Sequence, residues 1–248
     1  MRRFFVPPVA LRSETAEIRG GDALHLSSVL RLRPGDEVEL FDGAGGICRA
    51  VIETIDSAAV TVSILSRSRA SGESSLAITL AMGFLKDKKM DALVRQLTEL
   101  GIRNFLPFFC RRSIPRPDEE RMGKRKGRWE KIAREAVKQC GRGRIPEISP
   151  VVDFTEMISI GERQQYKFFF WESGTDPVPF ARAGKTYERA FLAVGPEGGF
   201  TQAEAEAARN AGFCIASLGP RILRAETAAV AACTMVQYVL GDMGPEKT

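Results

Sequence analysis

The chain has 248 residues, of which 44% are hydrophobic and 27% charged, the balance of a globular protein that can bury a core. This length allows one large domain or two unequal ones. No apolar run approaches the roughly 20 residues of a membrane-spanning helix, and the N-terminus lacks the apolar stretch of a signal peptide. A single histidine, His25, excludes a His-rich metal site, so no metal is expected.

Five scattered cysteines form no Cys-x-x-Cys spacing. Without an export signal they are expected to be reduced thiols, which predicts a cytoplasmic protein. The single histidine also makes a Ser-His or Cys-His hydrolase hard to assemble. His25 shares a helical segment with Leu26 and Val29, so a structural role for it is favoured over a catalytic one.

Positive charge is concentrated in one segment. Residues 111–144 contain 13 Lys or Arg and 5 Asp or Glu, whereas the whole chain has a net charge of +5. The remaining residues are therefore slightly acidic. A localised basic patch attracts polyanions, which makes nucleic acid the default partner. A solvated helix face is the alternative explanation for such a run.

The first part of the chain predicts a small β unit of barrel type. Alternating apolar residues indicate strands over 37–41, 47–55 and 59–65. A short helix is expected over 25–32. Residues 70–75 are small and polar, which is typical of a linker.

Strands and helices alternate after this linker. Strands are predicted over 76–84, 104–109, 168–171, 190–194 and 213–218, and helices over 89–100, 128–141, 201–211 and 226–240. Thr201 and Glu204 have the spacing of a capping box. This alternation predicts an α/β fold with an open, largely parallel sheet covered on both faces.

Two segments that follow predicted strands are candidates for a ligand site. Gly195–Phe200, with the sequence Gly-Pro-Glu-Gly-Gly-Phe, could bring backbone amides close to a ligand at the start of a helix. It has neither the Gly-x-Gly-x-x-Gly spacing nor the Gly-Lys-Ser/Thr of a phosphate loop. Taken alone, such a segment is more often a simple strand-to-helix turn.

The second segment, Ser217–Ala228, places two arginines, a glutamate and a threonine around apolar Ile222 and Leu223. Ligands of open α/β sheets bind beyond the carboxyl ends of the strands, where both segments should lie. A surface Arg–Glu pair that caps the last helix explains the segment equally well.

Together, Gly195–Phe200 and Leu218–Ala228 closely resemble the signature of the 16S rRNA uridine-N3 methyltransferase family, part of the knotted SPOUT methyltransferases. The resemblance extends along nearly the whole chain. It includes Arg2–Phe5, His25–Arg31, Phe41–Gly43, Lys89–Met90, Gln96, Glu99–Gly101, Trp129, Ile132, Glu135–Ala136, Gln139, Arg142 and Glu172. Ala225, where the family has Thr, and the looser Arg112–Pro115 motif depart from the pattern.

The resemblance implies a PUA-like β-barrel RNA-binding domain over 1–70 and a trefoil-knotted α/β methyltransferase domain over 71–248. It further implies S-adenosylmethionine as the cofactor, a homodimer, and 16S ribosomal RNA within the small subunit as the partner, with no membrane. Methylation of uridine N3 requires removal of an imide proton and an unpaired or flipped base.

The site residues follow from the same resemblance. The expected cofactor-binding residues are Leu192, Val194, Gly195, Pro196, Glu197, Gly198, Gly199, Leu218, Gly219, Leu223, Arg224, Glu226 and Thr227. Arg224 is expected to stabilise charge on the uracil or hold a phosphate. Glu197 or Glu226 is the proton acceptor, or else a structural partner of Arg221 or Arg224. Phosphate contacts are expected from Arg2, Arg3, Arg31, Arg112, Lys138 and Arg142.

Two alternative functions remain at this stage. One is a SPOUT methyltransferase with a different RNA target, which the intact Leu218–Arg224 segment disfavours. The other is a non-catalytic RNA-binding or ribosome-assembly factor with the same fold, which the complete glycine loop disfavours. A Rossmann-type methyltransferase is also disfavoured, because the glycine loop comes late in the chain.

Overall fold

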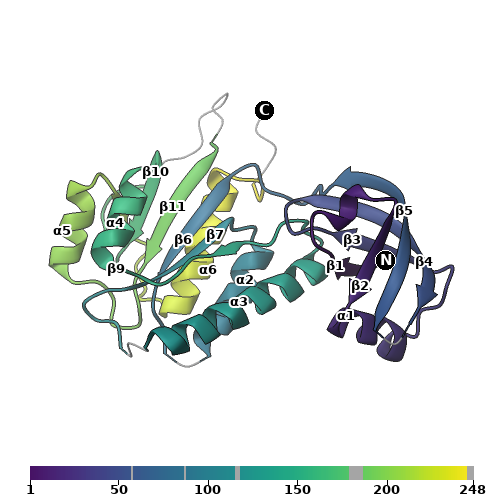
Figure 1. The fold of residues 1–248 in the computed structure, drawn as a ribbon. Coiled ribbons are helices and arrows are strands. Elements are labelled where there is room, and N and C mark those ends of the chain that lie inside the picture. The colour runs from purple at the N-terminus through teal and green to yellow at the C-terminus, as the bar shows by residue number, and fades with distance from the viewer. Residues whose placement is uncertain (57, 87, 115–117, 179–186, 245–248) are drawn as a thin grey trace. The chain divides into compact units, whose positions relative to one another are not determined.

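The chain forms two compact units, each with its own sheet (Figure 1). The computed structural model describes residues 1–56, 58–86, 88–114, 118–178 and 187–244. The N-terminal unit comprises Met1–Glu73 and Arg134–Ile145, and the C-terminal unit comprises Ser74–Ala133 and Pro146–Thr248. The N-terminal unit therefore includes a second segment of chain, in addition to the residues before the predicted linker.

A five-stranded sheet with the order β1-β3-β4-β5-β2 forms the N-terminal unit. Its strands are β1 (Arg2–Phe5), β2 (Thr15–Arg19), β3 (Glu37–Phe41), β4 (Gly46–Ile55) and β5 (Ala59–Arg69). β1 pairs with β3 in parallel, and the other neighbours are antiparallel. Three short helical turns complete it: η1 (Ala10–Arg12), α1 (Gly21–Leu24) and the π-type η2 (His25–Val29).

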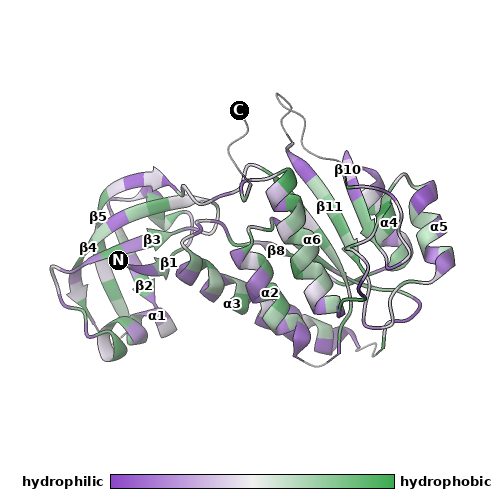
Figure 2. Cartoon of the chain, turned by 180° about the vertical axis from the view of Figure 1, so that it is seen from behind, coloured by the Kyte–Doolittle hydropathy of each residue, from purple (hydrophilic) through white to green (hydrophobic). Residues whose placement is uncertain are grey.

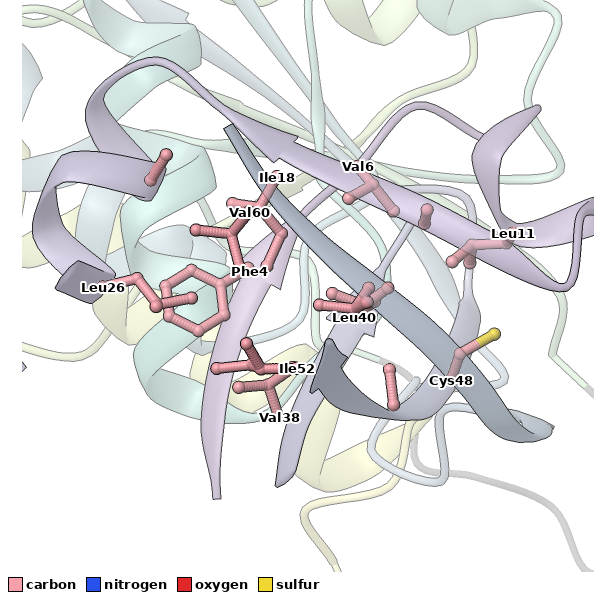
Figure 3. Close-up of a cluster of buried hydrophobic side chains, with 14 residues drawn as sticks. Phe4, Val6, Leu11, Ile18, Leu26, Val38, Leu40, Cys48, Ile52 and Val60 are labelled. Carbon is pink, nitrogen blue, oxygen red and sulfur yellow. The ribbon is translucent and has the colours of Figure 1, made fainter. Parts of the chain in front are cut away.

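Alternation along these strands creates one apolar cluster inside the N-terminal unit. Figure 3 shows Phe4, Ile18, Leu26 and Ile52 pointing toward one another from different elements. All four side chains are at most 2% exposed. Burial of this kind stabilises the folded state by about 25 cal/mol for each Å² of apolar surface. This cluster therefore gives the small unit its own core.

Glu73 attaches the second segment of chain to the N-terminal unit. Its Oε1 accepts hydrogen bonds from the backbone amides of Gly143 at 3.0 Å and Arg144 at 2.9 Å. Its Oε2 accepts from the Arg142 guanidinium at 3.0 Å, and the Arg142 side chain is only 4% exposed. A buried ion pair persists when further hydrogen bonds satisfy it, as the two amides do here.

The C-terminal unit is a parallel sheet with the order β12-β10-β11-β6-β7-β8, and β9 also pairs with β7. Its strands are β6 (Ala77–Gly83), β7 (Asn104–Phe109), β8 (Glu147–Ile148), β9 (Val152–Asp153), β10 (Tyr166–Phe170), β11 (Arg189–Val194) and β12 (Cys214–Ala216). Its helices are α2 (Lys89–Glu99), α3 (Glu119–Cys140), α4 (Phe154–Glu162), α5 (Gln202–Asn210) and α6 (Ala225–Val239). The C-terminal end of α3 belongs to the N-terminal unit.

Helices cover both faces of this parallel sheet. On one face, Met157 of α4 and Ala205 and Ala208 of α5 join Phe169 and Phe191 of the sheet in an apolar cluster. On the other, α6 packs on β6 and β11, and α2 packs on α6. Figures 1 and 2 show these two groups of helices on opposite sides of the strands.

The predicted alternation of strands and helices is confirmed, including the capping box, in which Thr201 accepts from the Glu204 amide. The short strands β8 and β9 were not predicted, and three further details of the prediction are wrong. The helix predicted from residue 128 begins at Glu119, where the polar first turns give no apolar stripe. α4 was missed, although Asp153 caps it by accepting from Glu156. The helix predicted over 25–32 starts at Gly21 and ends at Val29.

Among the described residues, no helix is both long enough and apolar enough to cross a membrane.

Candidate functional site

A pocket of about 450 Å³ lies at the carboxyl ends of β10, β11 and β12. Three connecting segments and the start of α2 form its walls. It is lined by Lys89, Phe170, Trp171, Glu172, Val194, Gly195, Pro196, Glu197, Gly198, Gly199, Phe200, Ser217, Leu218, Gly219, Arg221, Ile222, Leu223, Arg224, Ala225 and Ala228. Its position and size suit a small organic ligand bound at the edge of an α/β sheet.

The loop after β11, Gly195–Phe200, is called the glycine loop below. It approaches β6 so closely that a Cβ on Gly83 would lie 2.4 Å from the backbone nitrogen of Pro196. The amide of Gly199 donates to the carbonyl of Pro196 at 2.8 Å, closing a turn, and Gly199 has a φ of +65°. A side chain at Gly83 would overlap the loop, and a side chain at Gly199 would strain its backbone. Either substitution would therefore displace the loop.

The second wall is the segment between β12 and α6. Ser217 Oγ accepts from the amide of Gly219 at 3.2 Å, and Gly219 has a φ of +99°. Arg224 is the N-cap residue of α6, with extended backbone, and its side chain is exposed at the pocket. Ile222 is 87% exposed. This wall therefore presents both a cation and an apolar side chain to solvent.

Lys89 connects the two walls. Its Nζ lies 3.1 Å from Glu197 Oε1 in the glycine loop and 3.6 Å from Glu226 Oε2 in α6. Glu197 Oε1 also accepts from the amide of Lys86 at 3.3 Å. Partial burial by itself raises the pKa of Glu197, but the backbone amide of Glu197, the Lys89 ammonium and the Lys86 amide together hold this pKa below its usual range. The hydrogen bond to Glu197 raises the pKa of Lys89. Both groups therefore stay charged.

Arg112 holds the glycine loop from another side. Its guanidinium donates to the carbonyl of Gly198 at 3.0 Å and to that of Phe200 at 3.2 Å. A Cβ on Gly198 would come within 3.0 Å of the Arg112 Cβ. Arg112, expected from the sequence to contact RNA phosphate, is an exposed residue whose guanidinium lies on this loop.

Most of the expected cofactor-binding residues come together at this pocket. The ten that line it are Val194, Gly195, Pro196, Glu197, Gly198, Gly199, Leu218, Gly219, Leu223 and Arg224. The other three do not line it. Leu192 is fully buried within β11, and Glu226 and Thr227 lie in the first turn of α6.

Sequence reasoning about the cofactor missed several pocket-lining residues, notably Lys89, Trp171 and Glu172. Trp171 and Glu172 directly follow β10, so the rule that ligands bind beyond strand ends could have included them. Lys89 lies in α2, beyond the end of β6, and its sequence position alone did not mark it as a pocket residue. Trp129, one of the residues that carry the family resemblance, is 1% exposed and donates to Asp91.

Three of the six expected RNA-contact residues are held inside the N-terminal unit. Arg142 is buried and forms an ion pair with Glu73. Arg3 is 10% exposed and donates to Glu39 and to the carbonyl of Val137. Lys138 is 15% exposed and pairs with Asp22 and Glu135. Arg2 and Arg31 are exposed.

Comparison with known proteins places this pocket in context. Residues 72–237, more than half of the chain, match the model of an RNA methyltransferase domain, and residues 18–65 match that of an RNA methyltransferase PUA domain. Ribosomal RNA small subunit methyltransferase E of Bacillus subtilis (strain 168) is 28% identical over 256 residues, covering 96% of each chain. The protein of that name from Buchnera aphidicola subsp. Schizaphis graminum is 30% identical over 219 residues, covering 88% of each.

A solved structure is also similar over nearly its full length. The ribosomal RNA small subunit methyltransferase E of Neisseria gonorrhoeae, bound to S-adenosyl methionine, is 31% identical. It superposes with a TM-score of 0.86, over 98% of this chain and 99% of that one.

Replacing Gly83 with alanine is expected to destabilise the C-terminal unit by about 1–3 kcal/mol, because the new Cβ overlaps the backbone of the glycine loop. Gly123→Ala is the matched control, since nothing lies within 4 Å of its Cβ in α3. It should stabilise by about 0.5–1 kcal/mol through helix propensity. Both tryptophans, Trp129 and Trp171, belong to this unit, so urea unfolding followed by fluorescence measures it. Equal stability of the two variants would contradict the close approach.

Proposed function

Because this chain belongs to the RNA methyltransferase family, we propose that it transfers a methyl group from S-adenosylmethionine to N3 of one uridine in 16S ribosomal RNA. The resemblance drawn from the sequence to this family is confirmed. The observation that carries the proposal is the pocket formed by Gly195–Phe200 and Leu218–Arg224, the two segments that carry that resemblance.

The pocket fits S-adenosylmethionine. Gly195, Gly198, Gly199 and Gly219 add no side chains to its walls, and Val194, Leu218 and Leu223 supply apolar surface. A cavity of about 450 Å³ is large enough for a nucleoside with an amino-acid chain. When bound, the cofactor supplies an electrophilic methyl group on a sulfonium ion.

Arg224 is the group proposed to act on the uracil. Its guanidinium projects from the N-cap of α6, where the backbone amides of the first turn also favour negative charge. Loss of the N3 proton gives the uracil ring a negative charge, which a fixed cation stabilises most strongly as it develops. Arg224 would therefore favour the anion whose N3 attacks the methyl group.

Glu226 is proposed as the proton acceptor in preference to Glu197. Glu197 already accepts from Lys86 and Lys89, and its lowered pKa makes it a weaker base. Glu226 does not itself line the pocket, but it follows the pocket-lining residues Arg224 and Ala225 in the first turn of α6. Its contact with Lys89 is longer, at 3.6 Å. Glu197 is then a structural residue of the glycine loop.

The proposal extends to the organisation of the molecule. Residues 1–70 would form the PUA-like β-barrel that binds RNA, and residues 71–248 a SPOUT domain whose chain is threaded as a trefoil knot around the cofactor. Knots are rare among protein folds, so the pattern of strands and helices does not predict one. The proposal of a knot rests on the family membership alone. A homodimer, a small-subunit substrate and a cytoplasmic location complete the proposal, with Arg2 and Arg31 as phosphate contacts.

The experiment that tests this function is methyl transfer to mapped RNA. Purified protein is incubated with methyl-labelled S-adenosylmethionine and small ribosomal subunits from cells that lack the modification, and the labelled nucleoside is mapped by mass spectrometry. We expect label at one site, as N3-methyluridine. Label on another nucleoside would contradict the proposed target. Absence of label, together with absence of cofactor binding by calorimetry, would contradict the proposed methyltransferase activity.

Glu226→Gln is expected to lower kcat by about 10²–10⁴, the usual contribution of a general base, with little change in cofactor affinity. Glu197→Gln, the same chemical change on the other carboxylate, should weaken cofactor binding and change kcat less. Single-turnover rates and calorimetric dissociation constants separate the two effects. The opposite pattern would make Glu197 the proton acceptor.

Arg224→Ala is expected to lower kcat by about 10²–10³, the typical loss when one charge-stabilising donor is removed. Arg224→Lys keeps the charge and should recover part of the rate. Thermal unfolding of both variants checks that the fold is retained. A normal methylation rate in a folded Arg224→Ala variant would remove this arginine from the mechanism.

A further inference from the structure

Lys89, the first residue of α2, contacts two pocket segments that are far apart in the chain. One of its contacts is Glu197 in the glycine loop, at 3.1 Å, and the other is Glu226 in the first turn of α6, at 3.6 Å. All three side chains are partly buried, with exposed fractions of 36%, 29% and 27%. Lys89 itself lines the pocket.

We propose that Lys89 is a positioning residue for the cofactor, because its ammonium holds the glycine loop and the start of α6 at a fixed separation. It does so by neutralising one carboxylate on each segment. The proposal rests on the function given above, since these are the two segments assigned to S-adenosylmethionine.

The charges explain why the separation depends on this one side chain. Glu197 and Glu226 both contact the same nitrogen, so their carboxylates are close neighbours of like charge. At such distances, in a partly buried site, two carboxylates repel unless a cation lies between them or one takes up a proton. Without Lys89, the glycine loop and the first turn of α6 would move apart.

A backbone amide also fixes the position of the Glu197 carboxylate. Glu197 Oε1 accepts from the amide of Lys86 as well as from Lys89 Nζ, so two donors on the N-terminal side of α2 fix one oxygen. Arg112 holds the same loop through the carbonyls of Gly198 and Phe200. The loop is therefore fixed to β7–α3 by Arg112, and to α2 and α6 by Lys89. Of these two contacts, the one through Lys89 also reaches the second wall of the pocket.

A purely stabilising ion pair would have a different consequence. Isolated ion pairs near the surface contribute little to global stability. The expected effect of removing Lys89 is thus local motion of two segments, with the rest of the C-terminal unit unchanged. Local opening of this kind is measured by amide hydrogen exchange.

The test compares Lys89→Met, Lys89→Arg and Lys88→Met in the full chain. Lys88→Met is the matched control, because it removes the same charge from the preceding, exposed residue. In the unliganded protein, we expect faster exchange of amides in 195–200 and in the first turn of α6 for Lys89→Met only. The calorimetric dissociation constant for S-adenosylmethionine should rise about tenfold in Lys89→Met, the scale of one charge-assisted hydrogen bond, and recover partly in Lys89→Arg.

Unchanged exchange in both segments of Lys89→Met, or the same change in Lys88→Met, would overturn the proposal while leaving the proposed function intact. Failure of the wild-type protein to bind S-adenosylmethionine would overturn the function. The exchange experiment would still decide whether Lys89 holds the two walls together, because it needs no ligand.

Discussion

The parallel pairing of β11 with β6 on one side and β10 on the other constrains everything at the pocket. Parallel neighbours end at the same edge of the sheet, so the segments that follow them must share the space beyond that edge. The consequence is visible at Gly83, whose missing side chain lets the backbone at Pro196 pass directly against β6. The glycine loop therefore lies against the end of β6 and also lines the pocket, together with the segments that follow β10 and β12.

Charged side chains then hold in place the segments that the sheet brings together. Arg112 donates to two carbonyls of the glycine loop, and Lys89 forms an ion pair with a carboxylate on each wall. Neither residue belongs to the two segments that carry the family signature. Both come from elements that follow the neighbouring strands, β6 and β7. A ligand site can thus be locally encoded in its loops and still depend on distant residues for its shape.

The contrast between the two local segments and the distant residues that hold them explains what could be predicted from the sequence. Gly195–Phe200 and Leu218–Arg224 are short contiguous segments, so their composition and their place after predicted strands are enough to mark them as a candidate site. The capping box at Thr201 is equally local. The contact of Lys89 with Glu197 joins residues separated by 108 positions, and no periodicity encodes it. α3 was only partly predicted, because its first turns carry Gly123, Gly127 and charged residues in place of an apolar stripe.

The same limit applies to the basic residues, because charge alone does not tell which of them are paired within the fold. Lys138 and Arg142 belong to the basic segment 111–144, and Arg3 lies outside it. Each of the three is held by a carboxylate of the N-terminal unit. A side chain that is already desolvated and paired gains little from a phosphate, because it would first have to give up its partner. Counterion release requires cations that face solvent. Arg2, Arg31 and Arg224 are exposed and meet this requirement.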